Sequence, residues 1–346
     1  MPRTRHWHET WFLRIDVTVP RYYLGIDGGQ SSTVALIADE TGRVLGSGRS
    51  GPCNHVSAEE AAQKLKSVIG ECVGQACAEA GLDFATLVFA SACLGFSGGA
   101  TDKEAHIRPV IRTGHCKVTS DAEIALLGAT AGKPGVIVIA GTGSIAFGRN
   151  ADGETARAGG WGYIFGDEGS AFDLTRQALR AILQFEEGWG PPTMLRRMFL
   201  DATQSPNALH LLHRFYTPEY PRARVASLAR LVDRAAVTRD DVALAILAEA
   251  ASKLAWLVQA IWRNIFTFST SVTVSYTGGV FQSEILRASF AARIRELLSS
   301  VISAPRFSPA GGAVLEALRM DGIDGGLKNL PEAEKSVPFT AFGNIR

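Results

Sequence analysis

Residues Leu24–Val34 read LGIDGGQSSTV: an apolar run that ends in an aspartate and two glycines, then a glutamine, three hydroxyl residues and the start of a second apolar run. The flanking segments, Tyr22–Ile26 and Val34–Ala38, have the aromatic and β-branched content that favours strands. Glycine pairs often do no more than reverse the chain between two strands. Consecutive backbone N–H groups in such a turn can also form a concavity that binds an anion. Taken alone, the stretch is compatible with either role.

The same pattern returns in the second third of the chain. VIVIAG (136–141) has the character of a strand, GTGS (141–144) is a glycine-rich turn and IAFGR (145–149) is a second strand. In both places a polar turn follows, at 39–42 and at 150–153, and leads into a third extended segment. Two such β-β-β units predict two related domains that face each other, although two glycine-rich hairpins can also resemble each other by chance.

The remaining pattern alternates helices with strands, which predicts an α/β fold with a mixed sheet in each half. Ser57-Ala-Glu-Glu60 is a capping box that opens a helix ending near Gly81. Further helices are expected at about 168–185, 208–215, 222–236, 240–265, 282–299 and 311–320, and strands at 86–94, 117–119 and 271–276.

We expect three parts in the chain: an N-terminal extension at 1–20, an N-terminal domain at 21–131 and a C-terminal domain at 132–310. The last helix, about 311–325, is expected to pack back on the first domain. The extension reads MPRTRHWHETWFLRIDVTVP and lacks the apolar core of a signal peptide.

Composition excludes several classes of protein. The chain has 346 residues, 46% hydrophobic and 20% charged, which is an ordinary globular balance. With 35 basic and 34 acidic residues the net charge is +1, so the strong positive field of a nucleic-acid-binding protein is missing. No apolar run reaches membrane-spanning length, and we expect no membrane partner. The five cysteines form no CxxC pair, which argues against a disulfide framework or a zinc site and favours the cytoplasm.

Three glycine-bearing motifs fit a nucleotide. Asp27, before the first turn, could hold a hydrated Mg²⁺, which prefers one or two carboxylates together with phosphate oxygens. GTGS is the matching second phosphate clamp. TGGVF (277–281) lies between a strand and a helix, where a nucleotide can lie against bare backbone. A dinucleotide-binding GxGxxG would open a helix rather than a second strand, and no GxxxxGK[ST] is present.

Two acidic residues have two interpretations each. Asp121, in TSDAE (119–123), stands at a helix start and could cap that helix or accept a proton from a substrate hydroxyl. Asp167, in GDEGS (166–170), could likewise be a cap or a ligand-binding acceptor. AGGA (310–313) is expected to permit close helix packing, and Trp161 to be a packing anchor. The arginine-rich segment Arg222–Arg239 is expected to form a solvated or dimer-facing helix surface.

The order of DGGxSST, GTGS, TGGV and AGGA resembles the sugar kinase, Hsp70 and actin ATPase superfamily. Within it the chain is similar to the N-acetylglucosamine kinase branch of the BadF/BadG/BcrA/BcrD-type ATPases, from about Tyr22 to Met320. The motifs that carry this resemblance are PCNH (52–55), GFSGG (95–99), TSDAE (119–123), AGTGSI (140–145), GGWG (159–162) and GDEGSAF (166–172).

The resemblance implies two ribonuclease H-like domains with mixed β-sheets flanked by helices, and ATP and an amino sugar in the cleft between them. Asp27 would serve Mg²⁺. The implied nucleotide-binding residues are Gly28, Gly29, Gln30, Ser31, Thr33, Thr142, Gly143, Ser144, Gly278 and Gly279. The implied sugar-binding residues are Asn54, Ser97, Asp121, Gly160 and Asp167, with Gly160 near the acetamido group. Two positions depart from the family pattern: Gln30 replaces a common small residue, and Ala158 precedes GGWG where some relatives carry Cys.

The resulting hypothesis is ATP-dependent phosphorylation of the C6 hydroxyl of an amino sugar, N-acetylglucosamine first and glucosamine or N-acetylmuramic acid as alternatives. Asp121 would accept the hydroxyl proton. Two rivals of other classes are an ATPase activator of a CoA-ester dehydratase and a sugar- or nucleotide-binding protein without catalysis. The activators hold an iron–sulfur cluster through cysteines of the second domain, whereas this chain has none after Cys116. The relatives also suggest a homodimer.

Overall fold

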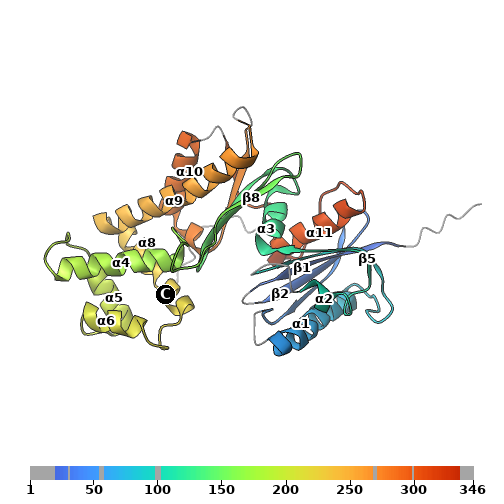
Figure 1. Cartoon of the computed structure of the whole chain (residues 1–346), viewed down its shortest axis with the longest axis horizontal. Coiled ribbons are helices and arrows are strands. Elements are labelled where there is room, and N and C mark those ends of the chain that lie inside the picture. The colour runs from blue at the N-terminus through green and yellow to red at the C-terminus, as the bar shows by residue number, and fades with distance from the viewer. Residues whose placement is uncertain are drawn as a thin grey trace, which may run out of the picture.

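The computed structural model describes residues 20–29, 32–53, 58–97, 103–267, 271–297 and 300–335. These residues form two lobes, and each lobe is built on a five-stranded mixed sheet (Figure 1). The expectation of an α/β fold with one mixed sheet in each half is therefore confirmed. The domain boundaries given above stay a prediction.

The two sheets have the same topology. In the first the order is β3-β2-β1-β4-β5, with antiparallel pairs up to β1 and parallel pairs from β1 onward. In the second the order is β10-β9-β6-β7-β8, again with one antiparallel meander and two parallel pairs. The strands are β1 Tyr22–Gly28, β2 Thr33–Asp39, β3 Val44–Ser50, β4 Phe89–Phe96, β5 Thr113–Ser120, β6 Gly135–Ala140, β7 Ser144–Arg149, β8 Thr155–Gly159, β9 Thr273–Thr277 and β10 Val301–Ser303.

The helices follow the expected pattern with three differences. The single helix expected at 222–236 is divided at Leu228, and the helices at Glu104–Ile107 and Leu195–Thr203 were not expected. The helices are α1 Ala58–Glu79, α2 Glu104–Ile107, α3 Asp121–Thr130, α4 Ala171–Glu186, α5 Leu195–Thr203, α6 Ala208–Phe215, α7 Arg222–Ser227, α8 Ala229–Val237, α9 Asp241–Ile265, α10 Glu284–Leu297 and α11 Pro309–Met320, with 3₁₀ turns η1 Gly279–Gln282 and η2 Glu332–Glu334.

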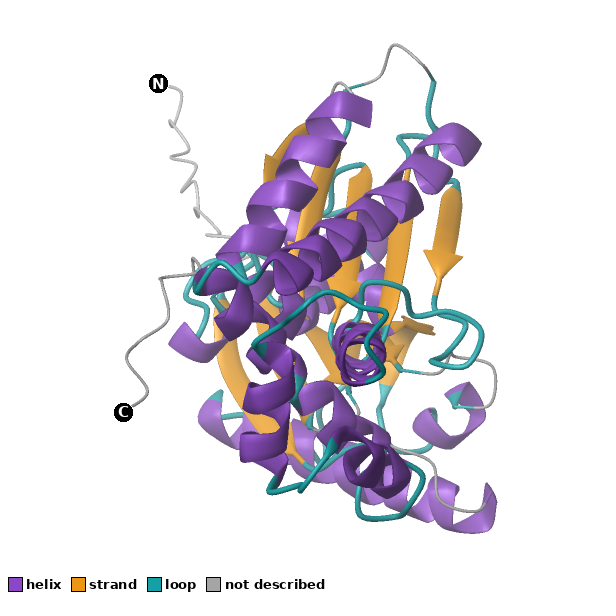
Figure 2. Ribbon diagram, turned by 90° about the vertical axis from the view of Figure 1, so that its left-hand side faces the viewer, coloured by secondary structure: helices purple, strands orange, loops and turns teal. Residues whose placement is uncertain are grey.

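Helices cover the sheets and bury their apolar faces. α1 packs on β2 and β3 of the first sheet, and α9 packs on β6, β7 and β8 of the second. Figure 2 shows the helices of the second lobe in front of its strands. α9 is long and apolar enough to cross a membrane by length and composition. Its buried side chains, Leu247, Leu254 and Val258 among them, belong to the main core of the second lobe, so it packs as a core helix.

Glycines bring α11 close to its neighbours. A Cβ at Gly312 would overlap with the backbone of Ile124 and Gly128 in α3, and a Cβ at Gly25 of β1 would overlap with Val314 of α11. Only a residue without a side chain permits backbones to approach this closely. The packing interpretation of AGGA (310–313) is therefore confirmed, and α11 lies on the first sheet.

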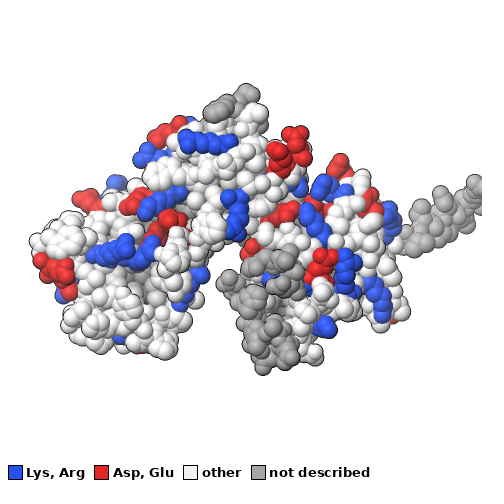
Figure 3. Space-filling view, viewed as in Figure 1, with Lys and Arg blue, Asp and Glu red and all other residues white. Residues whose placement is uncertain are grey.

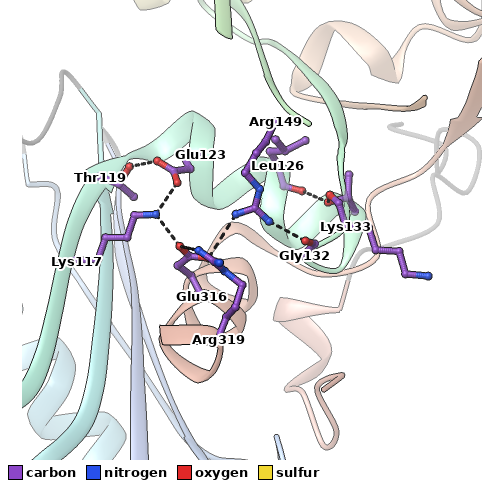
Figure 4. Close-up of polar contacts among 10 residues, drawn as sticks. Lys117, Thr119, Glu123, Leu126, Gly132, Lys133, Arg149, Glu316 and Arg319 are labelled. Atoms are coloured by element: carbon purple, nitrogen blue, oxygen red, sulfur yellow. Dashed lines mark hydrogen bonds and ion pairs between the residues drawn. The ribbon is translucent and has the colours of Figure 1, made fainter. Parts of the chain in front are cut away.

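Helix α3 also reaches the second lobe. Ala125, Leu126 and Ala129 on α3 form a small apolar cluster with Ile137 of β6. A polar network lies beside it and centres on Glu316 of α11 (Figure 4). Lys117 Nζ donates to Glu316 Oε1 at 2.6 Å, and Arg319 Nη2 donates to the same oxygen at 2.7 Å.

Arg149 joins this network from the other lobe. It belongs to β7, its Nη1 lies 3.6 Å from Glu316 Oε2, and its Nη2 donates to the carbonyl oxygen of Gly132 at 2.7 Å. Burial alone would raise the pKa of Glu316, but the hydrogen bonds from Arg319 and Lys117 outweigh it and lower the pKa to about 2. Glu316 is therefore an ionised, buried carboxylate whose ion pairs link the two lobes.

Candidate active site

The first half of the candidate site lies at the carboxyl edge of the first sheet. β1, β4 and β5 run parallel, with Asp27 paired to Gly95 and Phe96 paired to Ser120. The same edge of the sheet therefore carries three residues that lie far apart in sequence: Asp27, Ser97 and Asp121. The Ser97 hydroxyl donates to Asp121 Oδ2 at 2.7 Å. Two of the residues expected to bind the sugar are thus in direct contact.

The structure separates the two interpretations of Asp121. Ser120 is the N-cap of α3, and its side chain accepts a hydrogen bond from the Glu123 N–H at 3.2 Å. Asp121 is the first residue of the helix, and its Oδ1 accepts from the Ala122 N–H at 2.8 Å. Ser120, and not Asp121, therefore caps the N-terminus of α3. The second oxygen of Asp121 is left to the Ser97 hydroxyl and to a ligand.

Asp27 carries a perturbed carboxyl group. Burial, with smaller contributions from the charges of Asp121 and Glu334, raises its pKa from 3.8 to about 7, against the opposing effect of Arg49. The described residues give its carboxylate no hydrogen bond and no ion pair. A half-buried carboxyl group without a partner is costly, and a bound cation would remove that cost.

This setting fits Mg²⁺ that is held jointly with a nucleotide. Among the described residues there is no group of three or more His, Cys, Asp and Glu side chains that could hold a metal by itself. Mg²⁺ does not require such a group, because it commonly takes one or two carboxylates and completes its shell with phosphate oxygens and water.

The turn after Asp27 is shaped by close packing. A Cβ at Gly28 would overlap with the ring of Phe96, so the turn can lie over that ring only with glycine. The Gly29 N–H donates to the Ser32 carbonyl oxygen at 3.0 Å. Thr33 is fully buried, and its hydroxyl donates to the Gly51 carbonyl oxygen at 2.8 Å, so this side chain shapes the turn from inside. Gln30, Ser31 and Asn54 lie outside the described residues.

The second half lies at the corresponding edge of the second sheet. GTGS (141–144) follows β6, and the neighbouring parallel strand β9 ends at Thr277, which pairs with Ile139. Gly278 has φ +103°, and a Cβ there would overlap with the backbone of Ala140. A Cβ at Gly279 would meet no atom within 4 Å, so the space beside it is open. The GTGS and TGG motifs are therefore side by side, with Thr142 exposed.

Asp167 connects the predicted phosphate and sugar motifs of this lobe. Its side chain is 5% exposed and its backbone is left-handed, with φ +61°, a strained conformation for a residue other than glycine. The Ser144 N–H donates to Asp167 Oδ1 at 3.3 Å, and the Gly160 N–H donates to the Ser144 carbonyl oxygen at 2.9 Å. Gly143, Ser144, Gly160 and Asp167 thus form one connected group.

Sequence reasoning missed one member of this group and misjudged another residue. Arg222, at the start of α7, donates a hydrogen bond from Nη2 to Asp167 Oδ2, whereas we expected it on a solvated or dimer-facing surface. No local pattern connects residues that lie 55 positions apart. Trp161 is 68% exposed and lies against Arg157, so the expectation of a packing anchor is wrong. The glycines on both sides of it, at φ +73° and +81°, turn the loop outward.

The two halves belong to different lobes, and the surface is hollowed between the lobes (Figure 3). The first half supplies carboxylates, at Asp27 and Asp121. The second half supplies glycine backbone and an acid that is already paired with an arginine. Such a division suits a ligand with a phosphate part and a polyhydroxyl part, bound between the two edges.

Comparisons with known proteins agree on one family. A family model described as the BadF/BadG/BcrA/BcrD ATPase family matches residues 24–317. The N-acetylmuramic acid/N-acetylglucosamine kinase of Clostridium acetobutylicum is 34% identical over 268 residues, which cover 76% of this chain and 86% of the relative. The N-acetyl-D-glucosamine kinase of Dictyostelium discoideum is 27% identical over 280 residues, 74% of this chain and 84% of the relative.

A solved structure is also similar. It is that of a proposed N-acetylglucosamine kinase from Chromobacterium violaceum, with a TM-score of 0.68 and 27% identity, over 86% of this chain and 99% of the other. The likeness therefore extends over both lobes and not over a single motif.

Proposed function

Because this chain belongs to the BadF/BadG/BcrA/BcrD ATPase family, we propose that it is an amino-sugar kinase that transfers the γ-phosphoryl group of ATP to a sugar hydroxyl. The observation that carries this proposal is the contact between Ser97 and Asp121 next to Asp27. It unites a candidate general base, a hydroxyl that orients it and a candidate metal-binding acid at one sheet edge. The proposed acceptor is the C6 hydroxyl of N-acetylglucosamine.

The reaction proposed here is an in-line displacement. Asp121 accepts the proton of the C6 hydroxyl while the sugar oxygen forms a bond to the γ-phosphorus and the bond to the ADP oxygen breaks. The Ser97 hydroxyl donates to one oxygen of Asp121 and the Ala122 N–H donates to the other, so the two together fix the orientation of the carboxylate. Mg²⁺ at Asp27 would neutralise charge on the ATP phosphates.

The two turns would position the nucleotide. The proposed phosphate contacts are the glycine turn at Gly28–Gly29 and the backbone N–H groups of Thr142 and Gly143, and the open backbone at Gly278–Gly279 is the proposed adenosine contact. Asn54 and Asp167 would bind other sugar hydroxyls, and Gly160 the acetamido group. Approach of the two lobes would exclude water from the reacting phosphate. The remaining expectations, a cytoplasmic location and a homodimer, stay predictions.

An assay of ADP release across a panel of sugars tests this function. The panel contains N-acetylglucosamine, glucosamine, N-acetylmuramic acid, glucose and a reaction without sugar, each with and without Mg²⁺. We expect release that requires Mg²⁺ and an amino sugar, and a 6-phosphate product by NMR. ADP release that is the same with and without every sugar would contradict the kinase and favour an ATPase activator. Sugar binding without ADP release would favour a binding protein.

A further inference from the structure

Arg222 holds a guanidinium group beside the proposed sugar-binding acid. Its Nη2 donates to Asp167 Oδ2, and its Cζ lies 5.3 Å from the centre of the Tyr163 ring. Both charged groups lie close to the phosphate turn, since a Cβ on Gly143 would be 2.7 Å from Arg222 Nη2 and from Asp167 Oδ2. The Arg222 side chain is 37% exposed, so a ligand can reach it.

Most of the hydrogen-bonding capacity of Arg222 is unused. A guanidinium has five N–H donors, and it binds carboxylates and phosphates through two parallel hydrogen bonds. Among the described residues Asp167 is the acceptor for Nη2, and the buried Nε has no hydrogen-bond partner. The buried Nε is out of reach of a ligand, so the donors available for an acidic group are the remaining N–H groups of the two Nη atoms, on a side chain that is 37% exposed.

The phosphates of ATP already have other contacts in the proposed site, namely the backbone of the two turns and Mg²⁺. A neutral sugar requires no cation at all. We propose that Arg222 recognises a carboxylate on the amino sugar, the lactyl carboxylate of N-acetylmuramic acid, so that the site accepts this acidic sugar as well as N-acetylglucosamine. The proposal rests on the proposed function and on the expected contact of Asp167 with ring hydroxyls.

The chemistry of the sugar supports this assignment. N-acetylmuramic acid is N-acetylglucosamine with a lactyl group on O3, and its carboxylate is only two bonds from the ether oxygen. A cation that shares Asp167 with the ring hydroxyls is within reach of a substituent of that size. The negative charges of Asp121 and Asp167 would repel the lactyl carboxylate unless a cation stood beside it. The Clostridium relative is named for both sugars.

The loop next to Asp167 suits the rest of the lactyl group. Ile164 and Phe165 precede Asp167 by only two or three positions and are 65% and 84% exposed. Large apolar side chains exposed in this way, next to a polar site, commonly contact a ligand. They could cover the methyl group of the lactyl substituent, which N-acetylglucosamine lacks.

The test compares full-length wild type, Arg222→Gln, Arg222→Lys and the control Arg224→Gln. Arg224 is on the same helix, but it stacks on Tyr220 and pairs with Glu219, away from Asp167. Each variant is assayed for kcat/KM with N-acetylglucosamine, N-acetylmuramic acid and the neutral methyl ester of N-acetylmuramic acid. The ratios between these sugars cancel any general loss that follows from an unpaired Asp167.

We expect wild type to phosphorylate both sugars and to prefer the free acid to its methyl ester. In Arg222→Gln the ratio of N-acetylmuramic acid to N-acetylglucosamine should fall about 10- to 100-fold, the scale of one charge-assisted hydrogen bond, and the preference for the acid over the ester should vanish. Arg222→Lys should recover part of the ratio, and Arg224→Gln should leave it unchanged.

Two outcomes would overturn the inference: a wild type that phosphorylates N-acetylglucosamine but not N-acetylmuramic acid, or an Arg222→Gln variant whose ratios equal those of wild type. In both cases the proposed kinase activity on N-acetylglucosamine would still be supported. If no sugar stimulates ADP release in any variant, the proposed function fails, and the inference fails with it.

Discussion

The two glycine-rich turns share a chain path, but the acids that lie near them are paired differently. In the first lobe, the described residues leave Asp27 without a hydrogen bond or an ion pair, and burial raises its pKa to about 7. In the second lobe, Asp167 accepts from the Ser144 N–H and from Arg222. Strand order and turn position are the same in both lobes, but GTGS carries no acid: Asp167, from the loop before α4, and its partner Arg222 both come from outside the repeated unit.

This difference indicates that the acids of the two lobes have different roles. An unpaired carboxylate that is shielded from water lowers the stability of the fold. Such a loss is typical of sites that bind a cation or a reacting group. A paired carboxylate is already oriented and suits recognition. We therefore expect substitutions of first-lobe acids to change turnover, and substitutions around Asp167 to change substrate affinity and specificity. Substitutions in the two lobes test this division.

Asp121→Asn should reduce kcat about 10²- to 10⁴-fold, because the amide can still accept from Ser97 but cannot take the proton of the sugar hydroxyl. Sugar affinity, measured by calorimetry, should stay within a few-fold of wild type. Ser120→Ala is the matched control: it removes the N-cap of α3 and should cost about 1 kcal/mol of stability with little change in kcat. Near-normal turnover in Asp121→Asn would exclude it as the base.

Glu316→Gln should destabilise the protein by about 3–5 kcal/mol, because it removes the charge that pairs with Lys117, Arg319 and Arg149 in a buried setting. The pKa of Glu316 is about 2 in the folded protein, below its usual 4.5. Its contribution is therefore complete above pH 4.5 and is lost as the pH falls toward 2. Chemical denaturation of both proteins between pH 3 and 8 should show the difference shrink on the acid side.

Asp27→Asn should have the opposite effect on stability. Because folding raises the pKa of Asp27 from 3.8 to about 7, its ionisation opposes folding increasingly as the pH rises from about 4 to 7. A tenfold change in proton affinity corresponds to about 1.4 kcal/mol, so at pH 8 the variant should gain up to about 4 kcal/mol.

At pH 4 the gain in Asp27→Asn should be small, and at every pH the Mg²⁺-dependent activity should fall steeply. Denaturation curves at the two pH values and Mg²⁺ titrations of activity give the measurement. A variant that is less stable than wild type at pH 8 would show that the carboxylate has a stabilising partner, and the contrast between the two turns would fail.

The smallest effects are expected from the glycines of the two turns. A Cβ at Gly28 overlaps with the buried Phe96 ring, so Gly28→Ala should cost about 1–3 kcal/mol in thermal unfolding. A Cβ at Gly143 meets the ends of two side chains, which can shift, so Gly143→Ala should be milder in stability but should raise the sugar KM. Gly141→Ala is the control, because nothing lies within 4 Å of its Cβ. Equal losses of stability at Gly28 and Gly143 would contradict this account.

Much of the architecture could be predicted from local patterns. The mixed sheet in each half, the helix at 208–215 and the long helix that begins near Asp240 follow from periodicity, caps and turn residues, which act over a few positions. The break at Leu228 could not be found in this way, because α7 and α8 have apolar residues at helical spacing on both sides of it. The exposure of Trp161 was also missed, since it depends on the left-handed glycines around it.

Sequence alone determined the strands and turns, the duplication and the family, because these depend on residues that are close together or on whole motifs. Tertiary structure decided the pairing of charge. Asp167 meets Arg222 across 55 positions, and Lys117 meets Glu316 across 199. Asp27 has no partner among the described residues for the same reason: the fold brings the ends of three parallel strands together around this half-buried carboxylate. Electrostatic energies depend on the distance between charges and on their burial, and the order of the residues gives neither of these quantities.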